Sequence, residues 1–96
     1  DRIAALEERF RSTLCSVTRD FQTTHGYPRS KPGQANMTLA CNAVGQAHDC
    51  LSLTLEMPFK DNDDAPNPKT GWSGERSRQL GKTVLSTVAD LVTALR

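Results

Sequence analysis

The chain has 96 residues, of which 36% are hydrophobic, and it carries 12 Lys and Arg against 11 Asp and Glu. This length fits one small domain with a thin core, which buries about 60–65% of its unfolded surface if it is compact. A net charge of +1 without a long block of either sign argues against nucleic acid or an anionic membrane as partner, and no apolar run reaches the roughly 18 residues that span a bilayer, so the chain is expected to be soluble.

Residues 1–19 are expected to form a helix that packs one face on a core. Its apolar residues recur at spacings of three and four: Ile3, Leu6, Phe10, Leu14 and Val17. Asp1 is a good N-cap, and a chain that begins directly at a helix start suggests a trimmed or cleaved polypeptide. The charged segment DRIAALEERF is unlike a signal peptide.

Residues 22–36, QTTHGYPRSKPGQAN, are expected to form a loop because two prolines and two glycines interrupt any regular structure. A loop of this length in a small domain is more often functional than idle, so it is a candidate border of a binding site. Tyr27 is its one aromatic residue. Tyr27 is therefore either a ligand contact or a side chain that packs on the loop.

Two strands are expected next, joined as an antiparallel hairpin. In MTLACNAV (37–44) and in CLSLTLEMPFKD (50–61), apolar side chains alternate with polar or small ones, which is the period of a strand. Gly45 is the expected bend, and His48 is expected on the surface of the turn. Glu56 falls at the end of the second strand, on its polar face, where a cleft would explain the polarity.

The three cysteines, Cys15, Cys41 and Cys50, are an odd number and suit a reducing compartment, hence a cytoplasmic protein. They are expected to be buried thiols. The hairpin leaves open an oxidised pair between Cys41 and Cys50.

The last part of the chain is read as a surface loop and a second core-covering helix. Asp61, Asp63 and Asp64 suggest calcium, but the glycine and glutamate that an EF-hand loop needs are missing, so the calcium hypothesis fails. Trp72 is expected to pack the loop down, and Ser73 is a good N-cap. The helix that follows carries an apolar stripe: Leu80, Val84, Leu85, Val88, Leu91, Val92 and Leu95.

The predicted order is helix, loop, strand, strand, loop, helix, which belongs to the α/β class. Two strands are marginal as an independent sheet, and two helical stripes need more apolar surface than one hairpin offers. The strands are therefore expected to join a larger mixed sheet supplied by preceding sequence. Residues 1–96 would then be the C-terminal segment of a larger domain, incomplete as a fold of its own.

The segments NMTLACNAVG, SLTLEMPFKDN and GWSGERSRQLG resemble the C-terminal end of the zinc metallocarboxypeptidases, most closely the bacterial branch of the cytosolic type. The resemblance runs from about Asp20 to Gly81. In that family a strand ending in T-x-E, here Thr54 to Glu56, carries the general-base glutamate. The resemblance thus implies a mixed sheet with flanking helices, hydrolysis of C-terminal residues of peptides or proteins, and Glu56 as the catalytic residue.

The same resemblance implies a zinc ion whose ligands, an H-x-x-E pair and a distant histidine, lie outside this segment, because neither His25 nor His48 begins such a motif. This segment alone would then be inactive, and its partners would be peptide C-termini and the N-terminal part of the same domain. A mobile tyrosine upstream of the glutamate contacts substrate in the family, and Tyr27 is the candidate here. The strand near Asn36 carries no Arg or Lys that would explain a preference for acidic tails.

Two alternatives stay open at this point. One is a noncatalytic interaction module whose exposed half-core binds a partner subunit. The other is a hydrolase that uses Cys50 with His48, but no oxyanion-hole motif or orienting third group is apparent for it.

Overall fold

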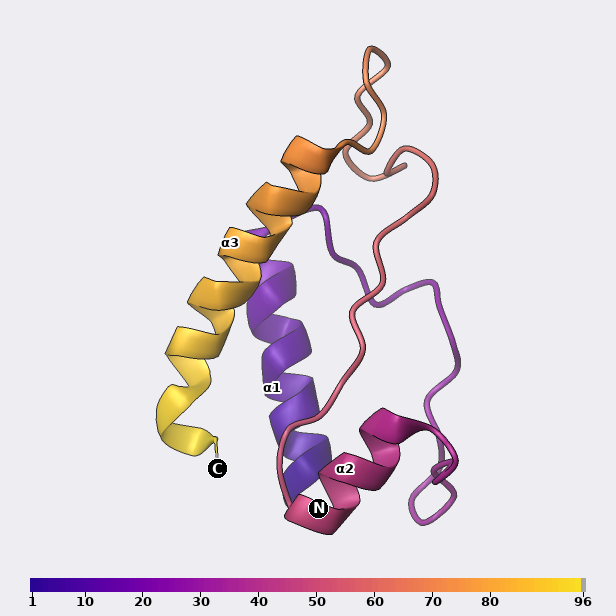
Figure 1. Ribbon diagram of the computed structural model, residues 1–96, viewed down its shortest axis with the longest axis vertical. Coiled ribbons are helices and arrows are strands. Elements are labelled where there is room, and N and C mark those ends of the chain that lie inside the picture. The colour runs from indigo at the N-terminus through magenta and orange to yellow at the C-terminus, as the bar shows by residue number, and fades with distance from the viewer. Residues whose placement is uncertain (96) are drawn as a thin grey trace.

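The computed structural model describes residues 1–95, and its regular structure is helical (Figure 1). The elements are α1 (Arg2–Val17), α2 (Ala40–His48), α3 (Gly74–Leu91) and a short 3-10 helix, η1 (Val92–Ala94). Helices α1 and α3 lie side by side, and α2 lies near the start of α1. None of the helices within residues 1–95 is long and apolar enough to cross a bilayer.

Both long helices start where the sequence predicts. The Asp1 carboxylate accepts a hydrogen bond from the Ile3 backbone N–H at 3.0 Å, and the Ser73 hydroxyl accepts one from the Arg76 backbone N–H at 3.2 Å. Each bond satisfies a backbone donor that the first turn of a helix leaves without an intrahelical partner. The two predicted N-caps are therefore confirmed.

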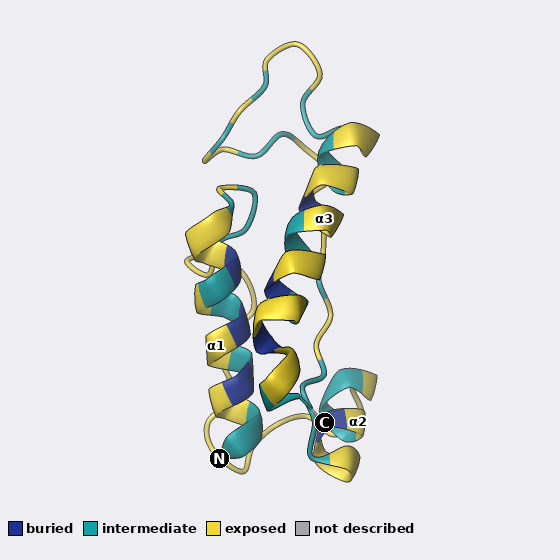
Figure 2. Cartoon of the chain, turned by 90° about the vertical axis from the view of Figure 1, so that its left-hand side faces the viewer, coloured by how far each residue is buried: buried dark blue, intermediate teal, exposed yellow. Residues whose placement is uncertain are grey.

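The core lies along the contact between α1 and α3, where the buried faces of the two helices meet (Figure 2). Its buried centre is made of Phe10, Leu14 and Leu91. Five partly buried side chains pack around this centre: Phe21, Leu51, Val84, Val88 and Leu95. The radius of gyration is 14.6 Å, against about 13 Å for a compact domain of about 100 residues, so the core is thin and the molecule is elongated.

Three members of the predicted apolar stripes are not in the core. Val17, Leu85 and Val92 are 55%, 71% and 60% exposed. Among the described residues, α3 packs mainly against α1, so the buried stripe is about as wide as one helix–helix contact, and residues at its edges stay in solvent.

The predicted α/β fold is wrong for this chain, because the described residues form three α-helices and no strand. Residues 37–44, predicted as the first strand, contain the start of α2 instead: 37–39 precede the helix, and 40–44 belong to it. Ala40, Ala43 and Ala47 favour a helix, and a two-residue period over eight residues is too short to override that preference. The predicted hairpin is therefore absent, and Gly45 lies inside a helix rather than at a bend.

The second predicted strand, residues 50–61, has no regular structure. A strand is defined by hydrogen bonds to a neighbour, and within residues 1–95 no segment provides them. Leu51 packs against the core, but Leu53 and Met57 are 39% and 49% exposed, so most of the apolar face that the alternation predicts is not buried here.

The expectation of buried cysteines is wrong for Cys15, which is exposed on α1, while Cys41 and Cys50 are half-buried. All three are free thiols. An oxidised pair between Cys41 and Cys50 was based on the hairpin, and the structure has neither.

Candidate active site

Glu56 lies in an irregular segment, residues 51–58, that runs from the end of α2 toward the loop before α3 (Figure 1). Its side chain is exposed, and it lines a broad hollow of about 1940 Å³ together with Thr54 and Tyr27. The one carboxylate predicted to be catalytic therefore borders a concave surface.

The segment is attached at its first end to α2. Asp49 ends that helix in the left-handed conformation, with φ of 47°, and the Cys50 backbone N–H donates to the Gly45 carbonyl at 3.2 Å. The chain then passes directly over Gly45, where an added Cβ would lie 3.3 Å from Ser52 Cβ. Gly45 thus allows the close approach that directs the chain toward Glu56.

The segment is attached at its other end through Asp61. One carboxylate oxygen of Asp61 accepts from the Asn67 backbone N–H at 2.7 Å, and the other accepts from the Asn62 backbone N–H at 2.9 Å and from Arg76 Nη1 at 3.0 Å. Asp61 therefore joins the end of the segment both to the loop that follows and to the first turn of α3.

Arg76 is the centre of this attachment. Its Nη2 donates to Asp20 Oδ1 at 2.5 Å and to the Ala65 carbonyl at 2.8 Å, and its guanidinium lies 4.9 Å from the centre of the Trp72 ring. The hydrogen bond to Asp20 is the main cause that raises the pKa of Arg76 above its ordinary value, with Asp61 adding to it. We refer to Asp20, Asp61, Trp72 and Arg76 as the Arg76 cluster.

The Arg76 cluster has no signature in the sequence. Trp72 was expected to pack the loop down; its indole N–H donates to the Ser77 hydroxyl of α3 at 2.9 Å. Arg76, however, is 56 residues from Asp20 and 15 from Asp61. No local spacing connects residues so far apart, and only the fold brings their charges together.

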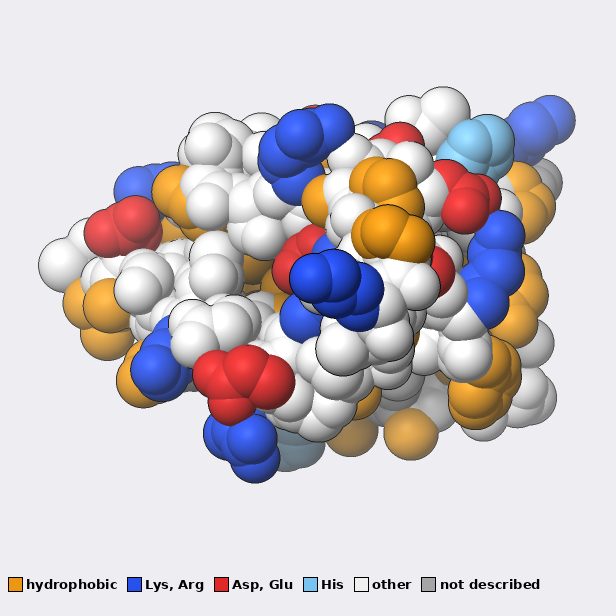
Figure 3. Space-filling model, turned by 90° about the horizontal axis from the view of Figure 1, so that it is seen from above, with side chains coloured by type: hydrophobic (Ala, Val, Ile, Leu, Met, Phe, Trp, Pro, Cys, Tyr) orange, Lys and Arg blue, Asp and Glu red, His pale blue; other side chains and the backbone are white. Residues whose placement is uncertain are grey.

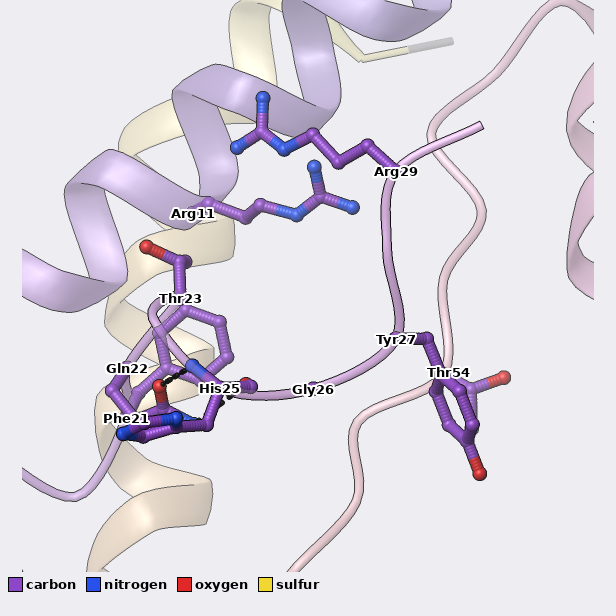
Figure 4. A pocket seen from close by; sticks show the side chains of 9 residues that line it. All are labelled: Arg11, Phe21, Gln22, Thr23, His25, Gly26, Tyr27, Arg29 and Thr54. Atoms are coloured by element: carbon purple, nitrogen blue, oxygen red, sulfur yellow. Dashed lines mark hydrogen bonds between the residues drawn. The ribbon is translucent and has the colours of Figure 1, made fainter. Parts of the chain in front are cut away.

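Tyr27 lies on the loop between α1 and α2 and is 89% exposed. It lines a smaller hollow of about 280 Å³ with Thr54, the first residue of the T-x-E pattern (Figure 4). The same loop is shaped by Gln22, whose side-chain amide donates to the His25 carbonyl at 2.9 Å and accepts from the His25 N–H at 2.6 Å. The structure thus brings Tyr27 and the segment that carries Glu56 to shared hollows.

The smaller hollow also contains Arg11 and Arg29, which gives it cationic side chains (Figure 4). Arg29 pairs with Glu8 at 2.7 Å and Arg11 with Glu7 at 3.4 Å. Both guanidinium charges are therefore compensated by neighbouring carboxylates.

Acidic and basic side chains are also interspersed over the end of the molecule where α3 begins (Figure 3).

The chain offers little for the other chemistries considered. His48 is exposed in the last turn of α2, as predicted, and the strand that would have placed His48 and Cys50 on one face is absent. In the part of the chain that the structure describes, no group of three or more His, Cys, Asp and Glu side chains could hold a metal ion.

The chain is similar to two solved structures. One is a metallo-carboxypeptidase from Pseudomonas aeruginosa in complex with (2-guanidinoethylmercapto)succinic acid, with 62% identity over 99% of this chain and a TM-score of 0.90. The other is a provisionally assigned carboxypeptidase A from Shewanella denitrificans OS-217, with 43% identity over 100% of this chain and a TM-score of 0.92. The resemblance to metallocarboxypeptidases is thus confirmed at the level of the enzyme class.

An uncharacterized protein of Zymomonas mobilis subsp. mobilis is 48% identical over 94% of this chain. The chain spans 24% of that protein, and 25% and 26% of the two solved chains. No protein-family model matches the chain.

Proposed function

We propose that this chain is part of a metallocarboxypeptidase of the cytosolic type, which hydrolyses C-terminal residues of peptides or proteins, and that it supplies the general-base residue Glu56. The observation that carries the proposal is the position of Glu56, on an exposed segment that borders a broad hollow, in a chain 62% identical to part of a metallo-carboxypeptidase. A cytoplasmic location agrees with the odd number of thiols.

A carboxylate suits this role because it can exchange protons with water and with an amine. In peptide hydrolysis a general base takes a proton from the attacking water and returns it to the leaving amine. For both transfers the base must lie within hydrogen-bond distance of the reacting water and amine, so its side chain must face a space that substrate can enter. Glu56 meets this condition, since it is exposed on the lining of the hollow.

The enzyme class implies a metal ion, usually zinc, and residues 1–95 do not fit one, since no ligand cluster is found among them. A catalytic zinc needs three protein ligands and an open position. We therefore place the zinc ligands in the remaining part of a longer protein and derive no step through the metal from this chain. On the same ground, this segment alone is proposed to be inactive.

Tyr27 is proposed to contact substrate. It projects from a loop, is 89% exposed, and shares a hollow with Thr54. A phenol combines an apolar ring with a polar tip, so it can cover a peptide side chain and hydrogen-bond a peptide group at once.

The exposed apolar side chains around the broad hollow are proposed to contact the rest of the same polypeptide. Phe59 is fully exposed, and Met37, Leu39, Leu53 and Met57 are 39–52% exposed. All of them line that hollow. The chain spans only a quarter of the metallo-carboxypeptidase that it matches, which leaves enough chain in a protein of that size to cover this surface.

The same surface would serve a noncatalytic module that binds a separate partner subunit. In the isolated chain the module leaves this apolar surface uncovered, and an uncovered apolar surface promotes association. The module predicts that the isolated chain self-associates through this surface. A stable monomer in size-exclusion chromatography counts against the module, whereas peptide hydrolysis by the longer protein, abolished by Glu56→Gln, decides for the enzyme.

The deciding experiment is therefore Glu56→Gln in the longer protein, assayed by release of C-terminal residues from peptides. We expect a loss of at least about 100-fold in kcat with metal content retained. The matched control is Asp63→Asn, which removes an exposed carboxylate that also lines the broad hollow and pairs with Lys60 at 3.0 Å. Unchanged hydrolysis in Glu56→Gln would end the proposal.

A further inference from the structure

Tyr27 is tethered on both sides by contacts that lie within two residues of it. On the preceding side, the Gln22 side-chain amide donates to the His25 carbonyl at 2.9 Å, and its oxygen accepts from the His25 N–H at 2.6 Å (Figure 4). On the following side, Arg29 Nη2 lies 2.7 Å from Glu8 Oε2. The backbone is therefore held two residues before Tyr27 and again two residues after it.

We infer that Gln22 and Glu8 are positioning residues for Tyr27. The inference rests on the proposed contact of Tyr27 with substrate. Both tethers lead to the packed part of the molecule, because Phe21, next to Gln22, packs against the core and Glu8 belongs to α1. The two contacts thus connect the place of an exposed side chain to the helical core.

The residues on either side of Tyr27 restrict its direction further. Gly26 has a φ of 140°, which L side chains rarely adopt. A Cβ added to Gly26 would meet none of the described residues within 4 Å, so the backbone conformation, and not a lack of space, favours glycine here. Pro28 disfavours the helical conformation for the residue before it, which is Tyr27. The chain therefore leaves His25 and reaches Arg29 along a restricted path.

This path brings Tyr27 to the small hollow that it shares with Thr54 (Figure 4). Thr54 is two residues before Glu56, so a shift of Tyr27 changes the place of the phenol relative to the segment that carries the proposed base. Glu8 is not among the described residues that line either hollow. An effect of Glu8 on substrate is therefore expected to pass through Arg29 and the loop.

The test compares Glu8→Gln and Gln22→Ala in the longer protein, with kcat/KM for peptide hydrolysis as the readout. We expect Glu8→Gln to lower kcat/KM by about 2- to 5-fold, since its pair with Arg29 is exposed and such pairs are weak. We expect Gln22→Ala to lower it by about 3- to 10-fold, because two hydrogen bonds are lost. Tyr27→Ala sets the upper limit, because both residues act through Tyr27.

The same two substitutions are then made in a Tyr27→Ala background. Residues that act only through Tyr27 have no further effect once its side chain is removed, so the losses should not add. A general structural role instead gives the same fold-loss in both backgrounds. This comparison therefore separates positioning of Tyr27 from damage to the loop as a whole.

Two matched controls complete the design. Glu75→Gln removes a carboxylate of α3 that is 62% exposed and pairs with Arg78 at 2.9 Å, and it should keep the wild-type kcat/KM. Gly26→Ala strains the backbone next to Tyr27 and should lower kcat/KM. Gly33→Ala strains a later residue of the same loop, where φ is 76° and the space is equally open, and it should leave kcat/KM unchanged.

The outcomes are distinct. A wild-type kcat/KM in Glu8→Gln or Gln22→Ala overturns the role of that residue, and equal losses with and without the Tyr27 side chain overturn the role of both. An unchanged kcat/KM in Tyr27→Ala overturns the proposed substrate contact and the positioning role with it. A loss in Tyr27→Ala combined with wild-type behaviour of Glu8→Gln and Gln22→Ala overturns only the positioning role.

Discussion

Gly45 and Ser52 approach so closely that a Cβ added to Gly45 would lie 3.3 Å from the Ser52 Cβ and 3.3 Å from the Cys50 carbonyl oxygen. The contact joins the inside of a helix to the chain that leaves it. Since Cys50 O belongs to the backbone, it cannot be moved aside as a flexible side chain could.

We predict that Gly45→Ala brings no gain in stability, although alanine normally stabilises a helix interior by about 0.5–1 kcal/mol over glycine. The close contact offsets the gain. Gly81→Ala is the matched control, because Gly81 lies in α3 with nothing within 4 Å of the added Cβ, and it should show the full gain. Thermal unfolding of the two variants tests this, and equal stabilisation by both would contradict it.

The core predicts a contrast between two leucines. Leu14 is fully buried between α1 and α3, so Leu14→Ala should lower the free energy of unfolding by about 2–5 kcal/mol. Leu85 was predicted to lie on the apolar stripe but is 71% exposed. Leu85→Ala should therefore change the free energy of unfolding by less than about 0.5 kcal/mol. Denaturant unfolding measures both. A large loss in Leu85→Ala would mean that another part of the protein covers this side of α3.

The start of α3 depends on Ser73. Replacing it with alanine removes the acceptor for the Arg76 backbone N–H and should lower stability by about 1 kcal/mol. Ser73→Asp keeps an acceptor, adds a negative charge at a helix N-terminus, and should retain the stability. Chemical denaturation distinguishes the two substitutions, and equal losses would show that the cap bond is not the cause.

We predict that the ionised Glu75 side chain makes a small, acid-sensitive contribution to stability at the same helix end. Hydrogen bonds from Gln79 and then Arg78 lower the pKa of Glu75 below its ordinary value of 4.5. The pKa of Glu75 is therefore lower in the folded state than in the unfolded state. The stabilisation is present when the pH is above the unfolded-state pKa, and it is lost as the pH falls through the folded-state pKa. Glu75→Gln should therefore weaken the fall of stability below about pH 4.5, measured as melting temperature against pH. A curve parallel to that of the unchanged protein would contradict the prediction.

The Arg76 cluster is a part of the candidate site that could not be predicted from the sequence. Glu56 and Tyr27 could be proposed from a resemblance carried by contiguous residues, and the structure places both on the lining of one hollow. The attachment of Asp61 to Arg76 and of Arg76 to Asp20 joins parts of the chain that no periodic pattern relates. Such contacts follow from the packing of α1 against α3, which brings the end of the first helix to the start of the other.

By itself the sequence determined the two long helices, their caps and most of their buried faces, because each of these depends on residues three or four positions apart. Tertiary structure decided the fate of residues 37–58. Their alternating pattern allows a strand, but a strand exists only with a hydrogen-bonding neighbour, and no such neighbour is present within residues 1–95. Part of that stretch forms α2, which is favoured by its alanines and makes its backbone hydrogen bonds within itself. The rest is the exposed segment that carries Glu56.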